Sequence, residues 1–265
     1  MKKLFTLALA AATLAGFSAC SNDEENNIDS TKGYINLGVT IDNTLATRAI
    51  QDAPVAKWYA VVTNEDGDYV YGTAGSKDLI GTTLSTKPLA AGSYNVAVAN
   101  FATNDAWLTA NDGFGAAYYE GNASEQTVTA GQTTDVDIDC GKAKNAKFNI
   151  VSSGFSGTAL TVNVTAPRTL TFDKTATPST IGKDAFFAPK AQLTYTITYT
   201  INGNTKTSDA KTITLGEAGS ASTLTIKSNK NGTISVSITY DDAYNGGTTD
   251  EIEIDAATGD EVVKP

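Results

Sequence analysis

Short segments in which apolar and polar side chains alternate recur along most of the chain. They are rich in Val, Ile, Thr and Tyr and lie at residues 33–42, 57–64, 93–100, 126–130, 133–140, 147–151, 159–165, 192–201, 205–215, 223–227, 233–240 and 251–255. A two-residue period places one side of each segment in a core, as in a β-strand. We therefore predict an all-β protein built of antiparallel β-sandwiches. Only residues 104–113 are expected to form one short helical turn or a loop.

Turn residues separate the predicted strands and suggest how they pair. Residues 65–68, 202–204 and 230–232 each contain an Asp-Gly or Asn-Gly turn between two alternating segments, which predicts three hairpins. The chain is long enough for two small sandwiches. A short basic stretch of small residues at 141–145 is the best linker. We expect a first sandwich at 33–142 and a second at 143–265.

In one predicted strand, the sequence pattern indicates which face is buried. Between residues 192 and 201, large apolar side chains occupy one parity and threonines occupy the other. Because successive side chains point to opposite faces of a sheet, the apolar set is expected in the core. That set is Leu193, Tyr195, Ile197 and Tyr199.

The N-terminus resembles a bacterial export signal. Two lysines precede a short apolar run that ends in Phe17-Ser18-Ala19-Cys20. The run is shorter than the roughly 20 apolar residues needed to span a bilayer, so residues 1–19 are predicted to be a cleaved signal peptide. Cys20 follows small residues as in the lipobox of lipoproteins, where this cysteine carries fatty acyl chains such as palmitate. The alternative is an ordinary secretory signal with an incidental Cys20.

The segment after Cys20 is acidic and polar. Residues 20–32 contain the cluster Asn22-Asp23-Glu24-Glu25 without apolar anchors, which predicts a disordered tether. The cluster resembles the surface-export signal of Bacteroidetes lipoproteins. It implies a protein anchored in outer-membrane lipid through Cys20 and facing the cell exterior. The alternative is a solvated linker that carries no targeting signal.

Composition argues against catalysis. The chain has no histidine, which excludes Ser-His-Asp and Cys-His nucleophile systems and His-ligated metals. Cys140 ends an alternating strand and is expected to be a buried structural thiol. The acidic turn with Asn64, Asp66 and Asp68 lacks the spacing of a calcium loop. We therefore expect no enzyme, no metal and no cofactor. The net charge of -10 argues against a nucleic-acid partner.

Four short sequence motifs, taken together in their order and spacing along the chain, resemble those of the fimbrillin-like surface lipoproteins of Bacteroidetes. The resemblance is in particular to a Bacteroides lipoprotein family that carries a domain-of-unknown-function label. The motifs are Gly33-Tyr34-Ile35-Asn36-Leu37 closing on Thr47-Arg48-Ala49; Leu89-Ala90-Ala91-Gly92-Ser93-Tyr94-Asn95-Val96; Tyr118-Tyr119-Glu120-Gly121 running on to Cys140 and Ala146-Lys147-Phe148; and Leu170-Thr171-Phe172 with the later Phe186-Phe187-Ala188-Pro189. The resemblance implies two transthyretin-like or immunoglobulin-like sandwiches. It also implies a pilus subunit, tip or anchor, or a stand-alone adhesin.

The same resemblance gives Arg48 a role. In fimbrillins, an arginine-directed protease cuts at a matching place, and a strand from the next subunit fills the slot that the first strand leaves. In this chain, removal of the first strand would uncover the apolar space that its side chains fill, which are those of Tyr34, Ile35, Leu37, Val39 and Ile41. The donor would be the strand at 251–254 or the tail at 262–265. The alternative is that Arg48 lies in an exposed loop and the first strand stays in place.

A second hypothesis is a monomeric surface lipoprotein that binds a glycan. The aromatic side chains Trp107, Tyr118 and Tyr119 are candidate glycan contacts, with Trp58, Tyr240 and Tyr244 as further aromatics expected to be exposed. Trp107 is the best candidate, because it lies in a loop-like segment. Aromatic residues in sandwiches more often pack in the core. The ligand, a host or microbial glycan or protein, stays open.

Overall fold

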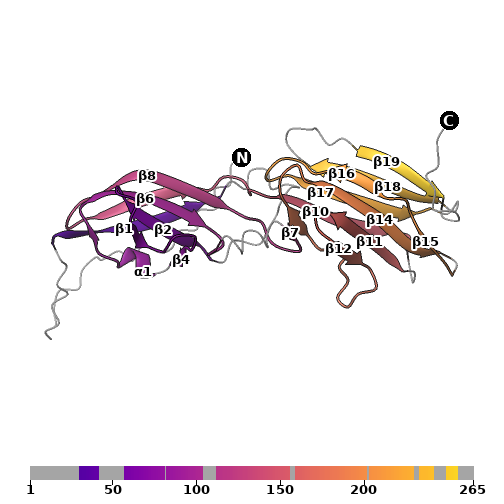
Figure 1. Cartoon of the computed structure of the whole chain (residues 1–265), viewed down its shortest axis with the longest axis horizontal. Coiled ribbons are helices and arrows are strands. Elements are labelled where there is room, and N and C mark those ends of the chain that lie inside the picture. Colours follow the sequence, from indigo (N-terminus) through magenta and orange to yellow (C-terminus); the bar gives the residue numbers. More distant parts are fainter. Residues whose placement is uncertain are drawn as a thin grey trace, which may run out of the picture. The chain divides into compact units, whose positions relative to one another are not determined.

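The computed structural model describes residues 30–41, 57–80, 82–103, 112–155, 159–201, 203–229, 233–241 and 249–255. Their regular structure is β-strand apart from one short helix, α1 (Thr82–Ser85). The chain divides into two compact units (Figure 1). Among the described residues, the first unit holds 30–41, 57–80, 82–103 and 119–141, and the second holds 112–118 and those from 142 onward. The predicted all-β, sandwich-type fold is confirmed.

The first unit contains two sheets. One has the strand order β5 (Leu89–Ala90), β1 (Lys32–Thr40), β9 (Thr133–Asp139). The other has the order β3 (Tyr69–Tyr71), β2 (Tyr59–Asn64), β6 (Gly92–Ala99), β8 (Glu120–Val128), and β4 (Asp78–Leu79) pairs with β2 next to β3. All these pairs are antiparallel except β1 with β9, which run parallel. The prediction of a purely antiparallel sheet is therefore wrong at this pair.

Buried apolar side chains from both sheets form the core of the first unit. They include Ile35 of β1, Val62 of β2, Val96 and Val98 of β6, and Val136 and Ile138 of β9. Cys140 is also buried, with 2% of its surface exposed, as predicted for a structural thiol. Gly121 in β8 makes this packing close: a Cβ there would lie 2.7 Å from Ile138 Cγ2 and 3.0 Å from Cys140 Sγ. A larger residue at 121 would force the two sheets apart.

The second unit also contains two sheets. One has the order β19 (Thr249–Asp255), β18 (Thr233–Asp241), β17 (Ala221–Ser228), β10 (Ala146–Ser153), β13 (Ala185–Phe187), β7 (Asp112–Gly113). The other has the order β12 (Leu170–Asp173), β11 (Leu160–Ala166), β14 (Gln192–Ile201), β15 (Asn204–Thr207), and β16 (Lys211–Thr214) also pairs with β14. A cluster of buried side chains from both sheets forms one core.

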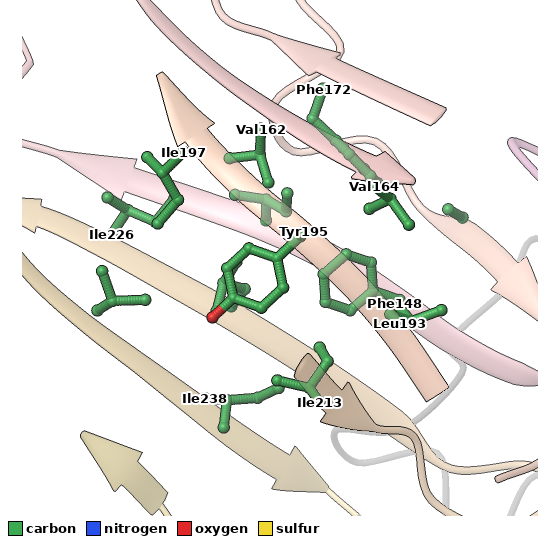
Figure 2. Close-up of a cluster of buried hydrophobic side chains, with 14 of the residues drawn as sticks. Phe148, Val162, Val164, Phe172, Leu193, Tyr195, Ile197, Ile213, Ile226 and Ile238 are labelled. Carbon is green, nitrogen blue, oxygen red and sulfur yellow. The ribbon is translucent and has the colours of Figure 1, made fainter. Parts of the chain in front are cut away.

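Strand β14 buries the face that its sequence predicts. Leu193, Tyr195, Ile197 and Tyr199 are all 3% exposed or less. The threonines between them are half-buried on the other face. Figure 2 shows Tyr195 and Leu193 among side chains of the facing sheet, including Phe148 and Ile238. Burying four large side chains from one strand makes β14 central to the stability of this unit.

The two units share one topological feature. In each, the first long strand pairs antiparallel with a short strand on one side and parallel with a later long strand on the other. In the first unit these partners of β1 are β5 and β9; in the second, the partners of β10 are β13 and β17. Both parallel pairs extend over seven residues. The two units are therefore variations on one arrangement of strands.

Two boundaries differ from the sequence predictions. Residues 112–118 belong to the second unit and not to the predicted first sandwich, because β7 pairs with β13. The predicted strand at 205–215 is two strands, β15 and β16, which both pair with β14. Ser208 separates them: its hydroxyl accepts a hydrogen bond from the N–H of Ile197 at 3.0 Å and so takes the place of a backbone carbonyl.

Candidate functional site

Strand β1 is held mainly through one edge. Seven residue pairs join it in parallel to β9, from Tyr34 opposite Thr133 to Thr40 opposite Asp139. Backbone hydrogen bonds close both ends of this pairing, from Tyr34 N to Gln132 O at 2.9 Å and from Cys140 N to Thr40 O at 2.8 Å. The attachment of β1 thus depends on a strand that lies far along the sequence.

The second edge of β1 is paired only at its start. Lys32 and Gly33 lie opposite Ala90 and Leu89 of β5. Beyond Gly33, no strand of the described ranges pairs with this edge. Gly33 itself is required by close packing, because a Cβ there would collide with the backbone oxygen of Thr129 and lie 2.6 Å from Val128 Cγ1.

The buried face of β1 is narrower than the sequence suggested. Ile35 is fully buried, whereas Tyr34, Leu37, Val39 and Ile41 are each half-buried. The predicted apolar slot therefore has one deep position and several shallow ones. A strand that replaces β1 needs a large apolar side chain at the place of Ile35 and tolerates more variety elsewhere.

The two predicted donor segments are strand β19, which contains residues 251–254, and the tail at 262–265. Strand β19 pairs with β18 at seven positions, and Ile254 is fully buried in the core of its own unit. Donating β19 to another molecule would break that pairing and expose Ile254. The tail at 262–265 lies outside the described residues.

Several predicted site residues also lie outside the described ranges. They are Cys20 with tether residues 21–29, Arg48 with its flanking residues, Trp107, and Tyr244. The end of the tether is described: Lys32 already belongs to β1, so the predicted disordered segment at 20–32 is wrong at this residue. Trp58 is half-buried.

The structure contradicts the prediction that Tyr118 and Tyr119 are glycan contacts. The two side chains are 5% and 3% exposed and have no free ring face for a sugar. Asparagine side chains hold their backbone: Asn145 Oδ1 accepts from Tyr118 N at 3.1 Å, and Asn100 Oδ1 accepts from Tyr119 N at 2.8 Å. These partners lie far along the sequence, so the local Gly-rich context could not reveal the burial.

The acidic turn between β2 and β3 is closed by its own side chains. Asn64 Oδ1 accepts a hydrogen bond from Asp68 N at 2.8 Å, which is the bond of a plain hairpin turn. No group of three or more metal-ligating side chains occurs among the described residues. Within the same ranges, no helix is long and apolar enough to cross a membrane.

One groove in the first unit was missed by sequence analysis. It has a volume of about 770 Å³ and lies where β3 and β4 meet the edge of β2. Its lining includes Tyr69, Tyr71, Gly72, Asp78, Leu79 and Lys87. The residues come from three separate short segments, so no single sequence motif could have indicated it.

Together, the fold and these features define a two-unit, all-β protein of the sandwich type. The chain belongs to the family of the domain of unknown function DUF4493, whose model matches residues 31–256. The match covers the described strands of both units. No curated protein matches the chain.

Proposed function

We propose that the protein is a lipid-anchored surface protein that serves as a subunit, tip or anchor of a surface fibre, or as an adhesin, with a binding role and no catalytic one. The observation that carries this proposal is the attachment of β1. A terminal strand that is paired along one edge to β9 can be exchanged for an equivalent strand of another molecule.

The energetics of the slot support exchange. Removal of β1 would leave seven residues of β9 without their pairing partners and an open position where Ile35 now packs. Unpaired backbone groups and exposed apolar surface are costly in water, which favours capture of a replacement strand. Backbone pairing would supply affinity, and the Ile35 position would supply register.

The sequence supplies the other elements of the proposal. Cys20 would hold the uncleaved protein in outer-membrane lipid, and Arg48 lies after β1, where cleavage would release the strand together with the lipid-bound N-terminus. Because β19 is built into its own sheet, the tail at 262–265 is the better donor. Residues 256–261 would then link it to the second unit.

The test is N-terminal sequencing of the protein recovered from cells, combined with gels run in detergent without heating. A mature chain that begins at Ala49, together with a ladder of polymers, supports assembly by strand exchange. Arg48→Lys should abolish both the new terminus and the ladder. Arg168→Lys is the matched control, because Arg168 is an exposed arginine in the second unit.

Recovery of every molecule with a blocked, lipidated Cys20 would overturn assembly by strand exchange. It would leave a stand-alone adhesin or an anchor in which β1 stays in place. Polymers that persist in Arg48→Lys would show that another mechanism joins the subunits.

A further inference from the structure

We infer that the groove between β3 and β4 binds a neutral saccharide chain, with Tyr69 as the stacking platform. This inference deepens the proposed adhesin by naming its ligand class. It relies on residues outside β1 and β9, so it can be tested without strand exchange.

Exposed apolar surface in the first unit is concentrated at this groove. Among the described residues, four large apolar side chains are exposed: Tyr69, Leu79, Phe114 and Val151. The two that belong to the first unit both line the groove. Tyr69 is 50% exposed and Leu79 is 47% exposed. Clustered apolar exposure of this kind marks a binding surface more often than scattered exposure does.

The groove has a rigid floor. Tyr71 is buried, and its hydroxyl donates a hydrogen bond to the backbone oxygen of Leu79 at 2.7 Å, which ties β3 to β4. Gly72 turns the chain over the edge of β2 with a φ of 71°, and a Cβ there would lie 3.1 Å from both Ala60 O and Ser76 O. The floor is therefore set before a ligand arrives, which lowers the entropic cost of binding.

Two charged side chains, Asp78 and Lys87, also line the groove. In the part of the chain that the structure describes, neither the Asp78 carboxylate nor the Lys87 ammonium has an ion-pair partner. A carboxylate accepts hydrogen bonds and an ammonium donates them, so the pair complements hydroxyl groups, which do both. An aromatic ring beside them offers an apolar face to the C–H side of a sugar ring. This combination of groups fits a saccharide.

The charge balance favours a neutral chain over an acidic one. The groove carries one acidic and one basic side chain, whereas the whole protein has a net charge of -10. Long-range repulsion would therefore weaken binding of a polyanionic glycan. A volume of about 770 Å³ lies within the range of ligand pockets, which is about 300–1,000 Å³.

An extended peptide fits the groove less well. Peptides that add to a sheet edge gain affinity from a row of backbone hydrogen bonds. Here β3 has three residues and β4 has two, and the chain leaves the sheet between them. The edge therefore offers too few backbone groups for strand addition, and side chains carry the recognition.

The test is affinity gel electrophoresis and a glycan array with the full-length protein, taken as the monomeric fraction. The probes are neutral polysaccharides (mannan, xylan, galactan, dextran and laminarin), with heparin and polygalacturonate as acidic comparisons and an immobilised Val-Thr repeat peptide as a strand-addition comparison. We expect binding to at least one neutral polysaccharide. Tyr69→Ala and Asp78→Asn should each weaken it about tenfold or more.

Matched variants separate the groove from general effects. Tyr69→Phe keeps the ring and should retain most of the affinity, while Lys87→Gln should weaken binding. Val151→Ala, Asp66→Asn and Lys77→Gln alter comparable side chains outside the groove and should bind like the parent protein.

Three results would overturn the inference: no binding to any neutral polysaccharide, binding that Tyr69→Ala and Asp78→Asn leave unchanged, or binding to the peptide alone. Because the assay uses monomers, these results leave the ladder test of strand exchange unaffected. A missing ladder likewise leaves the saccharide site in place.

Discussion

The side-chain amide of Asn36 donates a hydrogen bond of 2.8 Å to the carboxylate of Asp135, across two strands that run parallel and lie 99 residues apart in the chain. The pair is exposed and is the third of the seven pairs in the β1–β9 ladder. It fixes the register of β1 from the solvent side, while Ile35 fixes it from the core side. Asn36 and Asp135 therefore report on whether β1 is paired with β9.

Asn36→Asp should weaken the β1–β9 pair. It would place two carboxylates opposite each other, and like charges across a strand pair are unfavourable by about 0.2–1 kcal/mol. Chemical unfolding at neutral pH measures the loss of stability. Asn36→Ala is the control that removes the hydrogen bond without adding charge, and the difference between the two variants should shrink in high salt. Equal stability of the two variants at low salt would place Asp135 away from residue 36.

Ile197→Ala should destabilise the second unit. Ile197 is fully buried between the two sheets, so truncation leaves a cavity and should lower the free energy of unfolding by about 2–5 kcal/mol. Urea unfolding followed by tyrosine fluorescence measures the change. Thr196→Ala, on the other face of the same strand, should cost less than about 1 kcal/mol. An unchanged unfolding midpoint in Ile197→Ala would remove β14 from the core.

How much of the fold the sequence predicts depends on how regular each strand is. β14 was predicted to its exact bounds, because large apolar residues and threonines alternate along it without interruption. β8 was predicted only at its last three residues, because the predicted strand at 126–130 begins six residues after β8 does. A register shift after Tyr94 and the positive φ of Glu125 mark a bulge, and a bulge breaks the two-residue period. β13 was missed because Ala185, Phe186 and Phe187 are all buried and show no alternation.

The candidate site was less predictable than the fold. Its first strand was found from its pattern, but its parallel pairing with β9 depends on tertiary packing that no local pattern encodes. The groove depends on Tyr69 and Asp78, which come together because β3 and β4 both pair with β2, and on Lys87, which follows α1. Tyr118 and Tyr119 show the opposite error: their aromatic rings look like ligand contacts in sequence, yet distant packing buries them.

Cys140 should react with thiol reagents only after unfolding. The side chain is 2% exposed, and a thiol reagent needs access to the sulfur as well as a thiolate. The Cys20→Ala variant leaves Cys140 as the only thiol, so reaction with Ellman's reagent can be followed without ambiguity. We expect no reaction in the folded protein within minutes and one thiol per chain in denaturant. Fast reaction in native buffer would contradict the burial of Cys140.

Asp173 should contribute stability that depends on pH. The backbone N–H of Thr175, and then its hydroxyl, donate hydrogen bonds to Asp173 Oδ1 at 2.7 and 2.8 Å, and they lower the pKa of this carboxyl. Because the pKa is lower in the folded state, the contribution is present above the unfolded pKa. It is lost as pH falls through the folded pKa. NMR titration should give a pKa below the ordinary value of about 3.9. In Asp173→Asn this part of the pH dependence should vanish, and a pKa at or above the ordinary value would contradict the hydrogen bonds.

Cys20→Ala should release the protein from the membrane. If Cys20 carries fatty acyl chains, each buried CH₂ contributes about 0.8 kcal/mol, so several chains hold the two units at the surface and their loss leaves no comparable anchor. The variant should move from the detergent phase to the aqueous phase in Triton X-114 partition, and labelling of intact cells should fall. Cys140→Ala is the matched control, because it removes the other cysteine of the chain and should leave partition unchanged. If Cys20→Ala still enters the detergent phase and labels on intact cells, the anchor lies elsewhere, and the proposed release of β1 from a lipid-bound N-terminus loses its starting point.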